Sequence, residues 1–165
     1  MVIKYTNFSD GIHQLRFEEP VGKLGLEELF FGQVVVNCKM DKSIHQIVLT
    51  CDVEVNARLT CDRCSSGFEK KIGSHFLITY LLVKSSGIED DLNVKYLSPE
   101  EDKINISADT FEYIKLAMPM KVLCDEECKG LCPVCGINLN ENQCGCRVDK
   151  VNDVWEPLKK LKFNN

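Results

Sequence analysis

Eight of the ten cysteines in this chain occur in close pairs whose spacing suits a metal ion. In chain order the pairs are Cys61-x2-Cys64, Cys124-x3-Cys128, Cys132-x2-Cys135 and Cys144-x-Cys146. The first and third pairs have the spacing of metal knuckles, in which two sulfurs face one ion and turn amides point at the thiolates. One such motif predicts little, but several together favour structural zinc bound by thiolates.

The pairs predict two zinc ions per chain, each held by four cysteines. The third and fourth pairs are separated by eight residues, so they can close one site from local sequence. The second pair would then complete a site with the first pair, which lies about sixty residues earlier in the chain. A rival grouping joins the first pair to the third and the second pair to the fourth. The spacing favours the first grouping and leaves the rival open.

The residues give no sign of an active site. Four thiolates fill the coordination sphere of zinc, whereas a catalytic zinc keeps one position open for water or substrate. The chain has no phosphate-binding glycine motif, no GxSxG and no HExxH. His13, His45 and His75 lie outside the cysteine motifs, and we interpret them as surface or strand residues. The sequence therefore predicts structural zinc, no enzymatic activity and no small-molecule substrate.

The clearest pattern among the remaining residues is an alternation of apolar side chains at every second position from Ile47 to Cys61. A similar pattern follows the CDRC motif, at Phe68, Ile72, Phe76, Ile78, Tyr80 and Leu82. Period two is typical of strands with one buried face, so the two runs predict an antiparallel hairpin with the cysteine pair at its tip. The first run is long for one strand, which indicates a bend or bulge.

The fold class expected is α+β and mainly β. We expect residues 1–103 to form a small barrel or a curved antiparallel sheet, with a short helix within residues 24–32. Cys38 and Cys51 lie in strand-like segments, where we expect them to pack in the core as free cysteines. A scaffold of disulfides is disfavoured because the chain starts without a secretory signal.

Residues 104–165 are expected to form a second domain: a helix, the zinc-knuckle segment and a C-terminal tail. Ser107 is the candidate N-cap of the helix, and Pro119 should end it near Ala117 or Met118. The tail, residues 151–165, is expected to be partly helical.

Charge and composition limit the class of partner. The formal net charge is -5, and two four-thiolate zinc centres of charge -2 each would make it -5 - 2 - 2 = -9. This total argues against broad electrostatic binding to nucleic acid. Local basic patches could still contact RNA or a partner, and the candidates are Lys70, Lys71, Lys129, Arg147, Lys159, Lys160 and Lys162. With no apolar run long enough for a membrane span, we expect a cytoplasmic protein with reduced thiols.

The run LAMPMKVLCDEECKGLCPVCGINLNENQCGC, after a CDRC on a hairpin, resembles the YceD family of bacterial and plastid proteins. That family is associated with accumulation of large-subunit ribosomal RNA. The resemblance extends more loosely to Phe31–Val34 (FGQV) and Leu158–Leu161 (LKKL). It implies a non-catalytic, metal-binding factor in ribosome biogenesis, whose partner is large-subunit rRNA or a ribosomal or assembly protein. It carries over the eight paired cysteines as metal ligands.

Two other functions are consistent with clustered cysteines. One is a zinc-thiol redox switch or redox-regulated chaperone, in which oxidation expels zinc and exposes apolar surface. Acidic neighbours, as in CDEEC, disfavour free thiolates and count against this function. The other is an iron–sulfur protein, which metal analysis and the colour of the preparation would reveal.

Overall fold

The computed structural model describes residues 1–82 and 93–146, which form two compact units. Unit 1 comprises Met1–Leu59 and Phe68–Met120. Unit 2 comprises Thr60–Gly67 together with the chain from Lys121 onward. The expected boundary between residues 103 and 104 divides the chain once, whereas these two units interleave. None of the helices in the described ranges is long and apolar enough to cross a membrane.

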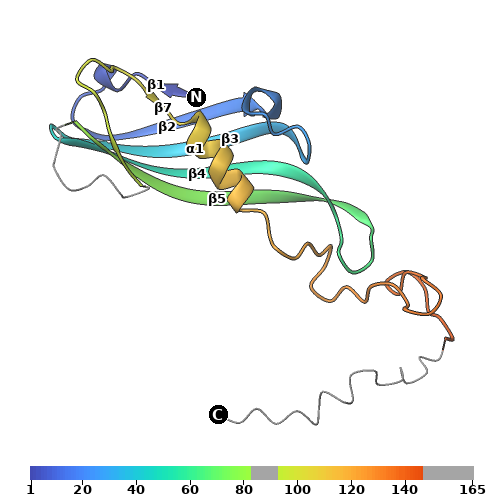
Figure 1. Ribbon diagram of the computed structural model, residues 1–165. Helices are drawn as coiled ribbons and strands as arrows, with labels where there is room; N and C mark the ends of the chain where they lie inside the picture. The colour runs from blue at the N-terminus through green and yellow to red at the C-terminus, as the bar shows by residue number, and fades with distance from the viewer. Residues whose placement is uncertain (83–92, 147–165) are drawn as a thin grey trace, which may run out of the picture. The chain divides into compact units, whose positions relative to one another are not determined.

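Unit 1 is built on a five-stranded sheet of order β2-β3-β4-β5-β6, shown in Figure 1. β2, β3 and β4 pair antiparallel, and β5 pairs with β6 in parallel. Only a six-residue loop separates β4 from β5, which makes these neighbours antiparallel as well. The strands are β2 (Gly11–Pro20), β3 (Phe30–Lys42), β4 (Gln46–Thr60), β5 (Gly67–Leu81) and β6 (Val94–Tyr96).

Smaller elements complete unit 1. A two-stranded antiparallel sheet pairs β1 with β7, and one α-helix follows β7 directly in the chain. The bounds are β1 (Val2–Ile3), the 3-10 turns η1 (Tyr5–Asn7) and η2 (Val21–Leu24), β7 (Ile104–Asn105) and α1 (Ser107–Leu116). The expected short helix within residues 24–32 is wrong. Its apolar end, Phe30–Phe31, instead begins β3, a strand rich in aromatic and β-branched residues.

The mainly β fold is confirmed, and of the two expected architectures the structure shows the curved sheet and not the closed barrel. Within the described ranges β2 and β6 are the two ends of the strand order. A shift of register between Phe31 and Val35 puts a bulge in β3, opposite the middle of β4. Gly32 has a φ of 78° there, a conformation that only glycine adopts without strain. The predicted irregularity is therefore real, but it lies in the partner strand of the long alternating run.

The alternation of the hairpin sequence separates a buried face from a charged one. Every second residue of β4 from Ile47 to Leu59 is buried. The opposite face carries cross-strand pairs between β4 and β5, namely Asp52–His75 (2.8 Å), Glu54–Lys71 (2.9 Å) and Arg58–Glu69 (3.2 Å). Exposed pairs of this kind add little stability. Burial of the apolar face is therefore what holds the sheet in place.

Helix α1 lies across the buried face of the sheet (Figure 1). Ile114 and Thr110 are buried there, and Tyr113 stacks on Phe76 with ring centroids 4.7 Å apart. The helix ends at Leu116 with Ala117 as C-cap, close to the expected end. The expected N-cap is wrong: Ile106 occupies that position without a side-chain bond, and the Ser107 hydroxyl accepts a hydrogen bond from the Met1 amino group.

A buried carboxylate joins α1 to the β5–β6 edge of the sheet. Asp109 is 6% exposed and forms a salt bridge with Lys95 of β6. Burial, and then the negative charge of Asp109, raises the pKa of Tyr80 far above its usual range. Neither the Tyr80 hydroxyl nor the second Asp109 oxygen has a hydrogen-bond partner among the described residues. Without Lys95, the buried Asp109 carboxylate would have no cation beside it among the described residues.

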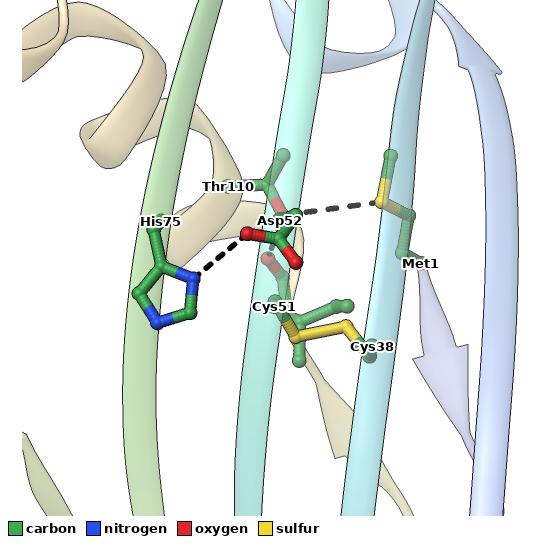
Figure 2. The surroundings of a disulfide bond; sticks show 7 residues. Met1, Cys38, Cys51, Asp52, His75 and Thr110 are labelled. Carbon is green, nitrogen blue, oxygen red and sulfur yellow. Dashed lines mark hydrogen bonds and ion pairs between the residues drawn. A yellow bond between two sulfur atoms is a disulfide. The ribbon is translucent and has the colours of Figure 1, made fainter.

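Cys38 and Cys51 form a disulfide, so the expectation of two free core cysteines is wrong in that respect. Both are fully buried, as expected. They face each other across β3 and β4 with Cα atoms 4.1 Å apart, the close spacing of a non-hydrogen-bonded antiparallel pair (Figure 2). The sequence places each cysteine on an inward position but does not give the register that sets them opposite one another.

Loss of the Cys38–Cys51 disulfide should lower the stability of the protein. Cys51→Ser removes a cross-link over 13 positions and buries a hydroxyl among apolar groups. We expect the free energy of unfolding to fall by about 3 kcal/mol, measured by urea denaturation at saturating zinc. The double variant Cys38→Ala/Cys51→Ala is the matched control, because it loses the cross-link without adding a polar group. An unfolding midpoint of the wild type that is the same with and without strong reductant would contradict this prediction.

Loss of the Lys95–Asp109 salt bridge should also lower the stability of the protein. Lys95→Ala leaves a buried carboxylate without its cation and should lower the free energy of unfolding by about 2 kcal/mol. Lys71→Ala, which removes an exposed pair with Glu54, should cost less than about 0.5 kcal/mol and serves as control. Adding Asp109→Asn to Lys95→Ala should restore part of the loss. Equal effects of the two lysine variants would show that Asp109 does not depend on Lys95.

Candidate metal centre

The first knuckle of unit 2 is the loop between β4 and β5. Its CDRC motif is turned by two backbone hydrogen bonds, from Ser65 N to Cys61 O (2.9 Å) and from Cys61 N to Ser66 O (2.9 Å). Ser65 adopts a φ of 57°, which is uncommon for a residue with a side chain. This turn places both cysteines of the motif on one side of the loop.

The second knuckle, CPVCG, repeats the same backbone construction. Gly136 N bonds to Cys132 O (2.9 Å), and Cys132 N bonds to Ile137 O (2.8 Å). The residue after the second cysteine again has a positive φ, here 75° at Gly136. Gly136 thus takes the place that Ser65 has in the first knuckle, as the two hydrogen-bond patterns show.

The backbone and two side chains of the hairpin loop bind the main chain of the segment after Met120. Asp62 and Val122 form two hydrogen bonds. The Asp62 amide donates to Val122 O (2.8 Å), and the Asp62 carboxylate accepts from Val122 N (2.6 Å). The Arg63 guanidinium donates to the carbonyls of Glu126 (3.2 Å) and Cys128 (2.9 Å). These contacts hold the second cysteine pair against the first.

Four sulfurs meet as a result. Cys61, Cys64, Cys124 and Cys128 form one group, whose Sγ atoms all lie within 4.8 Å of one another. The Cys61–Cys128 and Cys64–Cys124 sulfur distances are 3.8 Å and 3.6 Å. A tetrahedron with sulfurs about 2.3 Å from a central zinc has edges of about 3.8 Å. The first group thus has the size and donor set of a four-thiolate zinc site.

The second group is made of Cys132, Cys135, Cys144 and Cys146, and its sulfurs also lie within 4.8 Å of one another. It comes entirely from one short stretch of chain. Cys132 is buried, Cys144 is half-buried, and Cys135 and Cys146 are exposed. The structure therefore shows the grouping that the spacing favours, with two sets of four cysteines that could each hold a metal ion, and not the rival grouping.

The surroundings of the thiols lower the pKa of some cysteines and raise that of others. Hydrogen bonds from backbone amides, that of Cys124 above all, lower the pKa of Cys61 to about 6. Amides of Cys135 and Val134 lower the pKa of Cys132 to about 6. Burial, and then hydrogen bonds to neighbouring sulfurs, raises the pKa of Cys124 to about 12. In the second group, a hydrogen bond with the Cys135 sulfur, and then burial, raises the pKa of Cys146 to about 12. Each group thus contains a cysteine predisposed to the thiolate and another that resists a further negative charge, a conflict that a bound cation resolves.

Polar residues that the sequence analysis did not single out surround the first group. The Asn140 side chain donates from Nδ2 to Cys128 Sγ (3.2 Å) and accepts from Lys129 N (2.7 Å). Asn138 donates to Ser66 Oγ (3.3 Å). A cavity of about 350 Å³ opens beside this group, lined by Cys64, Ser66, Cys124, Asp125, Glu127, Cys128, Asn138, Asn140 and Glu141. In the sequence, these asparagines are visible only as the NLN run, residues 138–140, within the stretch that resembles the YceD family.

The other candidate residues belong to different units or lie outside the described residues. Lys70 and Lys71 are exposed on β5, and Lys71 pairs with Glu54. Lys129 is exposed in unit 2, next to Cys128. Arg147, Lys159, Lys160 and Lys162, as well as the tail expected to be partly helical, lie outside the described residues. None of the three histidines belongs to either cysteine group.

Comparisons with known proteins show the family that this chain is similar to. Residues 49–162 match the sequence model of the family described as large ribosomal RNA subunit accumulation protein YceD. A curated relative from Arabidopsis thaliana, named large ribosomal RNA subunit accumulation protein YCED homolog 1, chloroplastic, is 33% identical over 67 residues. That alignment covers 41% of this chain and 21% of the relative, so the matched part spans about a fifth of the relative's length.

No solved structure matches this chain. The family match nevertheless begins in β4 and runs through the first knuckle, helix α1 and both cysteine groups. It therefore includes every residue that builds the two candidate metal centres. Because this match covers well over half of the sequence, the chain belongs to the YceD family.

Proposed function

We propose that this protein is a non-catalytic zinc-binding factor in ribosome biogenesis that supports the synthesis, processing or accumulation of large-subunit rRNA. The family description supports the link to this RNA. The observation that carries the metal-binding part is the assembly of eight cysteines into two groups of four sulfurs. A set of four sulfurs completes the coordination of zinc, so neither centre would offer a position to a substrate.

Zinc is the metal proposed because of the donor chemistry. Soft thiolates select zinc, Cu(I) or iron–sulfur clusters over magnesium and calcium. When bound, zinc would supply a fixed positive charge that neutralises thiolates and ties two chain segments together. The residues that would hold it are the two groups described above. Their role is structural: they shape the surface that a partner meets.

The charge of the described part of unit 2 favours a basic protein partner over rRNA phosphates at this surface. Its described residues carry five acidic and three basic side chains, a net of 3 - 5 = -2. Two zinc–tetrathiolate centres would add -4, giving -6. The side chains counted are Asp62, Asp125, Glu126, Glu127 and Glu141 against Arg63, Lys121 and Lys129. Phosphate binding needs a positive surface, whereas a basic ribosomal or assembly protein would be attracted.

We further propose a cytoplasmic location. The eight free cysteines need a reducing environment to remain available for zinc. The disulfide between Cys38 and Cys51 is compatible with such an environment, because thiol exchange requires access to a sulfur and both residues are fully buried. No observation on the described residues supports the alternative of a redox switch or redox-regulated chaperone.

Metal analysis tests the first part of the proposal. Elemental analysis of the purified, zinc-saturated chain should give about two zinc ions per molecule, and Cys61→Ser and Cys132→Ser should each leave about one. The reason is that each substitution removes one of four ligands from a different group. Gln14→Ala, an exposed substitution on β2, should keep both ions and serves as control. A wild-type stoichiometry of one, or a brown protein containing iron and sulfide, would disprove the two-zinc assignment.

Depletion of the protein from cells tests its proposed role in the accumulation of large-subunit rRNA. Cells that lack the protein should contain less large-subunit rRNA relative to small-subunit rRNA, measured by quantitative RNA analysis. Expression of the wild type or Gln14→Ala should restore the ratio, while Cys61→Ser should not, because the first centre holds the two segments of unit 2 together. Affinity capture of the wild type should also recover ribosomal proteins. A normal rRNA ratio after depletion, without ribosomal material in the capture, would refute the role.

A further inference from the structure

The loop between Cys135 and Cys144, residues 136–143, belongs to the second cysteine group by its position in the chain. Its backbone is fixed close to the second knuckle, where Ile137 O accepts from Cys132 N (2.8 Å) and Leu139 N donates to Gly130 O (2.9 Å). An isolated antiparallel bridge pairs Leu131 with Asn138. The loop is therefore held against the second knuckle, and its two ends are cysteines of the second group.

The side chains of the same loop end at the first cysteine group. Asn140 donates to the sulfur of Cys128, a buried member of that group. The orientation of its amide is set by Lys129 N, which donates to Oδ1 (2.7 Å) and so turns the NH2 group toward the sulfur. Asn138 Oδ1 in turn accepts from the backbone and side chain of Asn140 (3.0 and 2.9 Å). In the closed loop, Asn140 is thus held with its amide toward Cys128.

A second connection runs through the backbone of the first knuckle. Leu131 N, one position before Cys132, donates to the carbonyl of Arg63 inside the CDRC motif (3.1 Å). Gly130 lies against the same carbonyl: a Cβ built there would be 3.0 Å from Arg63 O, and its φ is 77°. The two knuckles are therefore joined by main-chain contacts that tolerate little displacement.

We propose that the two metal centres are thermodynamically coupled, with Asn140 as the positioning residue that transmits occupancy of the second centre to the first. The proposal rests on the zinc binding proposed above. When the second centre is filled, loop 136–143 is closed and the Asn140 amide stabilises the Cys128 thiolate by a hydrogen bond to a charged acceptor. When it is empty, the loop is released and the first centre loses this bond. By linkage, filling the first centre strengthens the second by the same factor.

The loop also forms part of the wall of the cavity beside the first group. Asn138, Asn140 and Glu141 line it together with Cys64, Cys124 and Cys128. Release of the loop would therefore widen the approach to three of the four sulfurs. Zinc in the first centre should exchange faster with a chelator when the second centre is empty.

The experiment measures each centre separately in the full-length chain. The protein is titrated with zinc against a chromophoric chelator in reducing buffer, while amide NMR signals of Ser65 and Gly136 report the occupancy of the first and second knuckles. Asn140→Ala should lower the zinc affinity of the first centre about tenfold or more. Asn140→Asp, which is nearly isosteric but cannot donate to a thiolate, should lower it at least as much. Asn142→Ala is the matched control, an exposed asparagine on the same loop whose side chain bonds no described residue.

A double-variant cycle separates coupling from simple damage to the loop. In the Cys61→Ser background the first centre is disabled, so adding Asn140→Ala should leave the affinity of the second centre unchanged within twofold. If Asn140 merely stabilised the loop, the second centre would weaken in this background too, and the proposal would be overturned. It would equally be overturned if Asn140→Ala and Asn140→Asp both matched the wild type at the first centre.

These outcomes differ from failure of the proposed function. If the wild type bound fewer than two zinc ions, the two-zinc assignment itself would fail, and the coupling with it. If it bound two ions and the Asn140 variants behaved like Asn142→Ala, the assignment would stand and the coupling alone would be rejected.

Discussion

The packing of four sulfurs into a space less than 5 Å across is the constraint on which unit 2 depends. Thiolates at such distances repel one another. Backbone amides lower the pKa of Cys61 and Cys132, whereas burial and hydrogen bonds with neighbouring sulfurs raise the pKa of Cys124 and Cys146. A divalent cation removes the conflict. Among the described residues of unit 2, the buried side chains are those of Cys61, Cys64, Cys128 and Cys132, so metal coordination takes the place that an apolar core has in unit 1.

Much of the site could be read from the sequence because ligand count and spacing restrict the possibilities. Eight paired cysteines divide naturally into two sets of four, and the short interval between the last two pairs favours local closure. The hairpin was predictable for a similar reason, since fifteen residues of strict alternation leave one arrangement for β4. The family-like NLN run was visible too, but its role was not, because a hydrogen bond from Asn140 to Cys128 depends on how two loops meet in space.

What escaped prediction depends on register and tertiary contact. The disulfide needed the pairing of β3 with β4, which no local pattern of Cys38 or Cys51 contains. Strand β2 has no strong alternation, and it is specified by ten consecutive pairings with β3. Ser107 looks like a helix cap by type, yet its hydroxyl is engaged by the Met1 amino group, more than a hundred positions away in sequence. In each case a partner distant in the chain outweighed the local preference.

The interleaving of the two units has a consequence for the order of assembly. The first cysteine group joins sulfurs 60 and 67 positions apart, whereas the second closes within about a quarter of that length. Loop-closure entropy rises by about 0.6 kcal/mol per doubling of length, so the long-range group starts at a disadvantage of about 1.2 kcal/mol. During synthesis its first two cysteines emerge with the hairpin and must wait for the helix and the following segment to be made. Most of the chain between the two halves of the first group belongs to unit 1, so folding of unit 1 would order this intervening chain before the long-range centre closes.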